Sequence, residues 1–159
     1  MPASVYIETS VISYYTARSS RDLVAAARQT ITQEWWEEAR NRFDLYISTV
    51  VIAEAKTGDP LAAQRRMAAI ADLSVLDVND AAEDLAKQLI AQKLIPATSE
   101  EDALHIALAT VHGMDFLVTW NFRHINNAEI KARITAAIEA LGYESPILCS
   151  PEELGAAEP

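Results

Sequence analysis

Cysteine is nearly absent from this chain of 159 residues, and its one cysteine, Cys149, has no partner for an internal disulfide. A disulfide-rich secreted fold is therefore excluded, and a reducing, cytoplasmic setting is the default expectation. Glycine and proline number only 4 and 6, and no tract is compositionally biased, which argues against disorder. No apolar run reaches the roughly 18 to 20 residues of a membrane span, and no signal peptide is expected before the first strand.

Several common site motifs are also missing. No glycine-rich loop follows the first predicted strand, which argues against a dinucleotide or P-loop nucleotide site. No spacing of cysteine and histidine resembles a zinc site, and Ser10 lacks the context of a Ser-His-Asp nucleophile. The chain has 23 aspartates and glutamates but only 13 lysines and arginines, so its net charge is −10. This counts against a nucleic-acid ligand unless the excess acid gathers in a metal site away from the binding face.

The hydrophobic half of the chain is enough for one domain with a real core, and we expect residues 1–159 to form that single domain. Short, largely apolar runs are typical of strands buried on both faces, and they lie at 4–8, 45–50, 73–78, 116–120 and 146–149. Helical patterns lie between them, at 22–42, from Pro60 onward, and at 80–93, 99–112 and 127–141. The alternation predicts an α/β domain with a mostly parallel sheet and helices on both faces.

Polar side chains stand where the predicted strands end. Glu8 closes the first strand, Glu54 follows the second, and Asn121 closes the fourth, while Asp102 lies in the first turn of the helix at 99–112. Ligand sites of such folds lie beyond the carboxyl ends of the strands, so we expect these side chains to share one cleft. Two carboxylates ~5 Å apart repel by about 3 kcal/mol, and Mg²⁺ or Mn²⁺ would neutralise them through oxygen ligands.

Structural alternatives stand beside the first of these assignments. Glu8 could pair with a basic side chain at the sheet edge, and Thr9 and Ser10 could cap the helix that follows it. Glu54 could be an exposed helix residue, although its apolar neighbours favour a partly buried carboxylate.

The later positions also have alternatives. Asp102 fits a capping box with Ser99, three residues earlier, and Asn121 is a common strand-end or turn residue. His105, one turn after Asp102, could face the cleft or act as a hydrogen-bonded packing residue. Trp120 could stack on a base or pack at the strand end.

Four segments together resemble the PIN-domain family, namely VYIETSVISYY, STVVIAEA, EEDALHIALATVHGMDFLVTWNFRHI and the late SPEEL. More narrowly, the chain is similar to a VapC-type toxin of a bacterial type II toxin–antitoxin pair. The similarity spans nearly the whole chain, and its strongest segment is 101–125. The resemblance implies a three-layer α/β/α sandwich with a mostly parallel central sheet of about five strands.

The resemblance also implies an activity, a Mg²⁺- or Mn²⁺-dependent endoribonuclease that cleaves RNA with a metal-activated water. By position, Glu8, Glu54 and Asp102 would hold the metal, and Thr9 or Ser10 would match a small hydroxyl residue that supports the site. Asn121 falls where many members have a further aspartate, and would orient water or substrate. Two departures are evident, since the first acidic position is usually aspartate and Asn121 is neutral.

The same resemblance implies partners. These are an RNA substrate, a VapB-type antitoxin that covers the cleft, and a second copy of the chain in a homodimer, with no membrane. Arg18, Lys56 and Arg123 are candidates to steer the RNA backbone, with Trp120 as a candidate base contact. The alternative is a degenerate PIN scaffold that binds RNA or a protein without cutting. A phosphohydrolase of small molecules ranks last because the paired aspartates expected after the first strand are absent.

Overall fold

A computed structural model describes residues 1–155, so the last four residues of the predicted 1–159 domain lie outside the described part. Its strands are β1 (Ala3–Ile7), β2 (Phe43–Ser48), β3 (Ser74–Leu76), β4 (Phe116–Val118) and β5 (Ile147–Cys149). Its α-helices are α1 (Thr9–Thr16), α2 (Leu23–Arg42), α3 (Thr49–Ala55), α4 (Pro60–Ile70), α5 (Asp80–Ala91), α6 (Glu100–Val111), α7 (Lys131–Ala140) and α8 (Pro151–Gly155). A 3₁₀ turn, η1 (Ala97–Ser99), leads into α6.

The strands form one sheet in the order β3-β2-β1-β4-β5, and every neighbouring pair is parallel. The central strand β1 is buried on both faces, which explains why Val5, Tyr6 and Ile7 are an uninterrupted apolar run. The chain adds β2 and β3 on one side of β1 and then returns to its other side for β4. Strand order therefore reverses between β1 and β4, and such a switch point is where open α/β sheets bind ligands.

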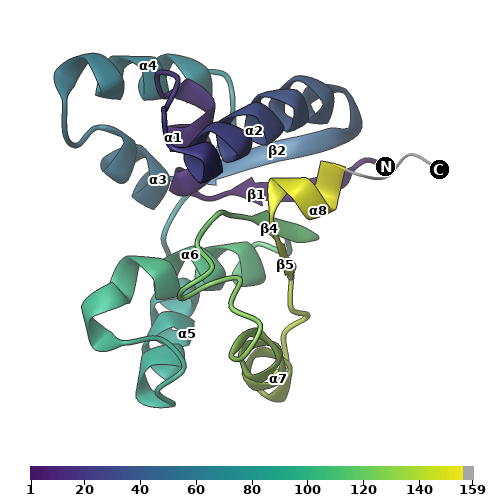
Figure 1. Ribbon diagram of the computed structural model, residues 1–159. Coiled ribbons are helices and arrows are strands. Elements are labelled where there is room, and N and C mark those ends of the chain that lie inside the picture. The colour runs from purple at the N-terminus through teal and green to yellow at the C-terminus, as the bar shows by residue number, and fades with distance from the viewer. Residues whose placement is uncertain (156–159) are drawn as a thin grey trace.

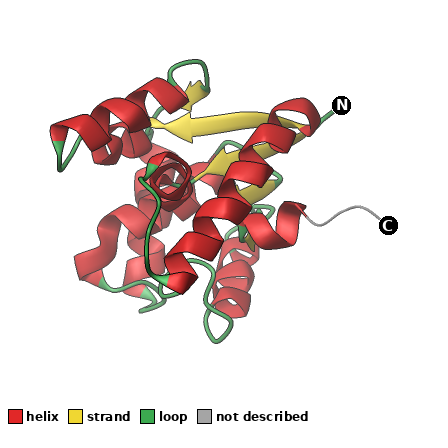
Figure 2. Ribbon diagram, turned by 45° about the horizontal axis from the view of Figure 1, so that its top comes forward, coloured by secondary structure: helices red, strands yellow, loops and turns green. Residues whose placement is uncertain are grey.

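Helices cover both faces of this sheet. Figure 1 shows α1, α2, α3 and α4 above the strands and α5, α6 and α7 below them, with α8 beside α2. Figure 2 shows the same layers with the yellow strands between red helices. The predicted three-layer α/β/α sandwich with a five-stranded parallel sheet is confirmed.

The boundaries differ from the expected ranges mainly where a polar residue begins a helix. The second strand was expected to run to residue 50, but it ends at Ser48, whose hydroxyl accepts the backbone N–H of Val51 and caps α3. The last long helix was expected from residue 127 and begins at Lys131, because Asn127 forms a turn and accepts the backbone N–H of Glu129. Helix α4 begins at Pro60, as predicted, and the side chain of Asp59 caps it.

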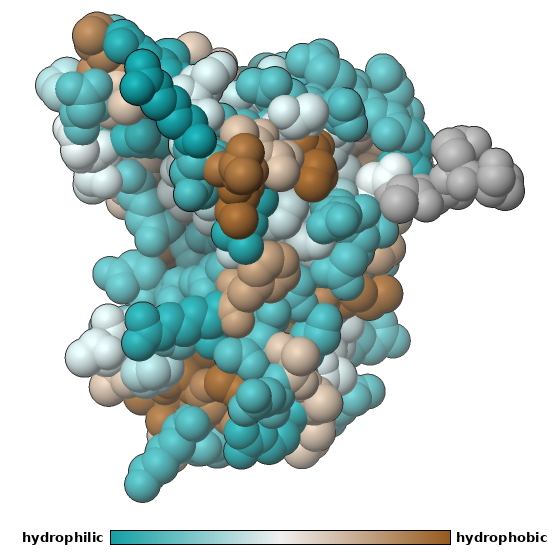
Figure 3. Space-filling model, in the orientation of Figure 1, coloured by the Kyte–Doolittle hydropathy of each residue, from teal (hydrophilic) through white to brown (hydrophobic). Residues whose placement is uncertain are grey.

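The carboxyl ends of the strands point the same way because the sheet is parallel. In Figure 2 the strand arrowheads point left, and in Figure 3 the surface is indented on its left side, between the upper and lower helical layers. The rest of that visible face is mostly hydrophilic, with separate brown patches. Among the described residues, no helix is long and apolar enough to cross a membrane.

Candidate metal site

Glu8 and Glu54 meet at the carboxyl edge of the sheet, as predicted. Glu8 follows β1 directly, and Glu54 lies near the end of α3, the short helix that leaves β2. A carboxylate oxygen from each and a ring nitrogen of His105 lie within 4.8 Å of one another. Glu8 is 6 % exposed, so its charge is held away from bulk water. Burying a carboxylate is costly unless a cation or several hydrogen bonds compensate for it.

Each glutamate uses one carboxylate oxygen for protein contacts. Oε1 of Glu8 accepts hydrogen bonds from the hydroxyls of Ser10 at 2.5 Å and Thr119 at 2.6 Å. Oε1 of Glu54 accepts the Thr9 hydroxyl at 2.5 Å and lies 2.7 Å from Nε2 of His105. The protein thereby fixes the orientation of both carboxylates, and their Oε2 atoms are the ones that a cation can use.

His105 anchors Glu54 from inside the core. The ring has no exposure, and its Nδ1 lies 2.7 Å from the hydroxyl of Tyr6, which is in turn 2.7 Å from the hydroxyl of Ser48. The chain Ser48–Tyr6–His105–Glu54 links the strands β2 and β1 to the helices α6 and α3. Both alternatives for His105 are therefore partly right, since it contacts the cluster and is a buried, hydrogen-bonded residue.

The pKa values follow from this chain of contacts. Burial alone would raise the pKa of Glu54, but the hydrogen bond and charge of His105, with the bond from Thr9, hold it below its usual value. Burial alone would lower the pKa of His105, but the bond to Glu54 and the charges of Glu8, Glu54 and Asp102 raise it. Burial raises the pKa of Tyr6, so its hydroxyl keeps its proton. The pair therefore favours a charged Glu54 beside a proton-bearing His105.

Asp102 lies near this cluster but has its own partner. It stands one turn before His105 on α6, and its charge acts on that ring. Its Oδ2 lies 2.8 Å from Nδ1 of His124, in the loop after β4. Asp102 is thus outside the group formed by Glu8, Glu54 and His105. The capping-box alternative is not seen either, because Ser99 makes no side-chain cap bond.

Asn121 is placed at the expected strand end, and its side chain organises a turn. Its Oδ1 accepts the backbone N–H groups of Arg123 at 3.1 Å and His124 at 2.9 Å. Those two bonds use both lone pairs of the oxygen. Asn121 therefore cannot accept a further bond from water in this arrangement, and its amide N–H groups are what it can offer to a substrate oxygen.

Thr9 and Ser10 support the carboxylates rather than cap α1. The N-cap residue of α1 is Glu8, and its side chain makes no cap hydrogen bond. The Ser10 hydroxyl bonds to Glu8 and also accepts the backbone N–H of Trp120 at 2.8 Å, which joins β4 to the start of α1. The prediction of hydroxyl support after the first strand thus matches the contacts of both residues.

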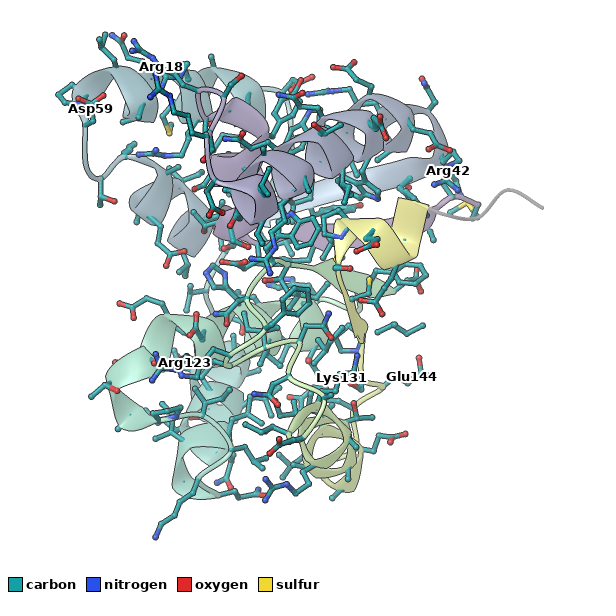
Figure 4. All side chains as sticks on the ribbon, viewed as in Figure 1. Arg18, Arg42, Asp59, Arg123, Lys131 and Glu144 are labelled. Atoms are coloured by element: carbon teal, nitrogen blue, oxygen red, sulfur yellow. The ribbon has the colours of Figure 1, made fainter. Side chains whose placement is uncertain are left out.

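The four residues proposed for substrate contact lie in different settings. Trp120 is 5 % exposed, and its indole N–H donates to Thr32 at 2.8 Å, so it packs and does not offer a stacking face. Arg18, Lys56 and Arg123 are exposed. Figure 4 shows Arg18 among the upper helices and Arg123 in the lower half of the molecule, on opposite sides of the sheet.

Sequence reasoning missed Thr119 and the roles of Tyr6, Ser48 and His124. Thr119 is fully buried and binds a glutamate 111 positions earlier in the chain. Its only local signal was a polar residue interrupting the apolar end of the fourth strand. Tyr6 gave no signal, because an aromatic residue in a buried strand is ordinary.

The donor set fits a hard divalent cation. Two carboxylates supply oxygen ligands of the kind that Mg²⁺ and Mn²⁺ prefer. Their mutual repulsion, about 3 kcal/mol at this separation, would be relieved by such an ion. Among residues 1–155, neither glutamate nor Asp102 forms a salt bridge with lysine or arginine, so the alternative of Glu8 pairing with a basic side chain is not found.

Comparison with known proteins agrees with this geometry. A sequence model described as "PIN domain" matches residues 5–130, which is most of the chain. The chain belongs to the PIN-domain family. The curated proteins include no sequence match to it.

A solved structure supports the same fold for this PIN domain. A chain in the crystal structure of VapBC2 from Rickettsia felis, bound to a DNA fragment from its promoter, superposes with a TM-score of 0.60. The two are 16% identical, and the match covers 92% of this chain and 98% of that one. At this identity the likeness concerns the fold. PIN domains are generally nucleases, so the family places this chain among proteins of that kind.

Proposed function

We propose that this PIN domain is a metal-dependent endoribonuclease, the VapC-type toxin of a toxin–antitoxin pair. The observation that carries the proposal is that Glu8 and Glu54 meet at one site. Hydrogen bonds fix one carboxylate oxygen of each glutamate. Within residues 1–155, neither glutamate forms a salt bridge with lysine or arginine. Membership of the PIN family and the structural likeness to a VapBC2 chain support it.

The residues of the site have different roles in this proposal. Glu8 and Glu54 would hold Mg²⁺ or Mn²⁺ directly, and Asp102 would act through water, because it lies outside their group and His124 occupies one of its oxygens. When bound, the ion supplies positive charge for the scissile phosphate and an activated water. His105 keeps Glu54 ionised and oriented, and the Asn121 amide can donate to a phosphate oxygen.

RNA would lie along the carboxyl edge of the sheet. Arg18, Lys56 and Arg123 are exposed and can contact its phosphates, which offsets the chain's net charge of −10 locally. The VapBC2 neighbour, a toxin–antitoxin complex on promoter DNA, supports a VapB-type antitoxin as partner. The homodimer stays a prediction, and sedimentation of the purified chain with and without a co-expressed antitoxin tests it.

The decisive experiment is cleavage of labelled single-stranded RNA by the purified chain with Mn²⁺, with Mg²⁺ and with EDTA. Cleavage is expected with either metal and should fall to background with EDTA and in Glu54→Gln. Glu101→Gln is the matched control, because Glu101 is an exposed carboxylate beside Asp102 on α6. Equal cleavage by Glu54→Gln would refute the site. RNA binding without any cleavage would favour the degenerate scaffold instead.

A cellular experiment tests the toxin role separately. Induced expression in a bacterium should arrest growth with the natural sequence and not with Glu54→Gln, and mapping of RNA ends should reveal new cuts only in the first case. Growth arrest in both strains would mean that the effect does not come from catalysis.

A further inference from the structure

An arginine and three aromatic side chains form a cluster next to the candidate metal site. The guanidinium carbon of Arg28, on α2, lies 5.3 Å from the ring centre of Trp120 and 5.2 Å from that of Phe122. Trp120 meets Phe122 edge-on at 6.0 Å and Tyr14 at 5.9 Å. We call these four residues the Arg28 cluster.

Arg28 carries a charge that no acid neutralises within residues 1–155. The arginine salt bridges in that part of the chain are Arg40 with Asp72 and Arg42 with Glu38. Arg28 has one long contact, 3.5 Å from Nη1 to the Tyr14 hydroxyl. In a chain with 23 acidic residues, an arginine held by ring faces and not by a carboxylate keeps its N–H donors for another anion.

Phe122 supplies the exposed aromatic surface of the cluster. It is 40 % exposed, whereas Trp120 beside it is 5 % exposed and bonded to Thr32. Phe122 lies in a tight turn in which its backbone N–H donates to the Trp120 carbonyl. An exposed phenylalanine on such a fixed support loses little conformational freedom when a planar ligand stacks on it.

The cluster is continuous with the carboxylates. The backbone N–H of Trp120 donates to the Ser10 hydroxyl at 2.8 Å, and that hydroxyl bonds to Glu8 at 2.5 Å. Phe122 stands two residues after Trp120, so its Cα lies within about 7 Å of the Trp120 Cα, and its ring centre lies 6.0 Å from that of Trp120. The Arg28 cluster is therefore within reach of a polymer that binds at the metal site.

We propose that Phe122 and Arg28 form a nucleotide subsite for single-stranded RNA. Phe122 stacks on one base near the scissile phosphate, and the Arg28 guanidinium binds a neighbouring phosphate. This inference rests on the proposed ribonuclease function. Ring stacking and phosphate binding recognise any base, and they require an unpaired strand whose bases are open. The subsite therefore favours single-stranded over double-stranded RNA and sets no strong base preference.

Binding and cleavage test the subsite separately. Fluorescence anisotropy of a short labelled oligoribonucleotide measures affinity in a Glu54→Gln background, which cannot cut. There Phe122→Ala should weaken binding about tenfold, and Phe122→Trp should restore it. With an oligonucleotide whose bases are replaced by abasic sites, Phe122→Ala should have no effect. Arg28→Gln should lower the salt dependence of binding by about one phosphate contact, and Arg28→Lys should keep it.

Cleavage by chains that retain Glu54 gives the second readout, with KM expected to rise more than kcat falls. Matched controls are Leu141→Ala and Arg133→Gln, an exposed apolar and an exposed basic residue at α7, which should change neither readout. Phe122→Leu keeps an apolar side chain without a ring, so the stacking claim is testable even if the alanine variant unfolds.

The outcomes separate the two proposals. If the natural chain cleaves RNA and the Phe122 and Arg28 variants bind and cleave as it does, the subsite is wrong and the ribonuclease stands. If the natural chain neither cleaves nor binds RNA, both proposals fall. If the variants lose binding to an acidic peptide and keep RNA binding, the cluster belongs to a protein partner and the subsite is overturned.

Discussion

Nε2 of His105 lies 2.7 Å from Oε1 of Glu54, and the His105 ring has no solvent exposure. The contact joins α6 to α3 across 51 positions of sequence, at the end of the sheet where Glu8 also lies. A buried histidine with both ring nitrogens bonded has one available orientation. It therefore fixes the rotamer of Glu54 before any ligand arrives, which lowers the ordering cost of binding a cation.

Replacing His105 should harm both stability and activity. His105→Phe fills the space but leaves Tyr6 and Glu54 without their partner, so unfolding free energy should fall by about 2–4 kcal/mol. Loss of such supporting contacts costs about 10–100-fold in metal affinity or activity. Urea unfolding and Mn²⁺ titration measure the two effects. The milder control is Tyr6→Phe, which removes only the hydroxyl behind the ring; an equal loss of metal affinity there would contradict a direct role for His105.

Divalent metal should stabilise the fold. An ion at 100 times its Kd adds about 2.7 kcal/mol, which for a chain of this size raises Tm by about 5–10 °C. Differential scanning calorimetry with Mn²⁺ and then with EDTA should reveal the rise and its reversal. Glu8→Gln should abolish the rise, while Glu101→Gln should retain it. An unchanged rise in Glu8→Gln would place the metal elsewhere.

The Asn121 turn should depend on an oxygen acceptor and not on charge. Asn121→Ala removes the acceptor for two backbone N–H groups, so stability should fall by about 1–2 kcal/mol. Asn121→Asp keeps that acceptor and should fold like the natural chain. Chemical denaturation of the natural chain and the two variants measures their stabilities. Equal destabilisation of the alanine and aspartate variants would contradict the prediction.

The Trp120 indole should need the Thr32 hydroxyl. Thr32→Val preserves shape but leaves a buried indole N–H without its acceptor, which should cost about 1–3 kcal/mol. Thr32→Ser keeps the hydroxyl and serves as the control, with a smaller loss from the missing methyl group. Equilibrium unfolding in urea measures both, and a valine variant as stable as the serine variant would speak against this bond.

Glu153, which is not part of the candidate metal site, should make the stability of the fold depend on pH. Burial would raise its pKa, but hydrogen bonds from the Ser150 backbone N–H and the Asn126 amide hold the pKa below the usual 4.5. A carboxyl whose folded pKa is depressed binds fewer protons in the folded state, so its contribution is present above pH 4.5 and lost as pH falls through the folded pKa.

The measurement is Tm against pH for the natural chain and Glu153→Gln. The natural chain should be slightly more stable at neutral pH, and the two curves should converge in acid below pH 4.5. The exposed neighbour Glu152, changed to glutamine, is the control and should follow the natural curve. Parallel curves for Glu153→Gln at every pH would contradict the assignment.

The sequence by itself determined the layers of this protein and the location of its two glutamates. Apolar runs such as Val5–Ile7 are typical of strands buried on both faces, and their alternation with amphipathic helices favours a parallel sheet. In a parallel sheet all strands end at one edge, so the sequence predicted that Glu8 and Glu54 lie near the same edge.

Only the tertiary structure decided which side chains touch there. The pairing of Thr119 with Glu8 and of His124 with Asp102 depends on strand register and on how α6 packs beside the loop after β4. The packing of Trp120 inward, with Phe122 left outside, follows from the position of α2, which brings Thr32 and Arg28 to the end of β4. Such contacts are sums of many weak interactions between segments far apart in the chain, and no local pattern of residues encodes them.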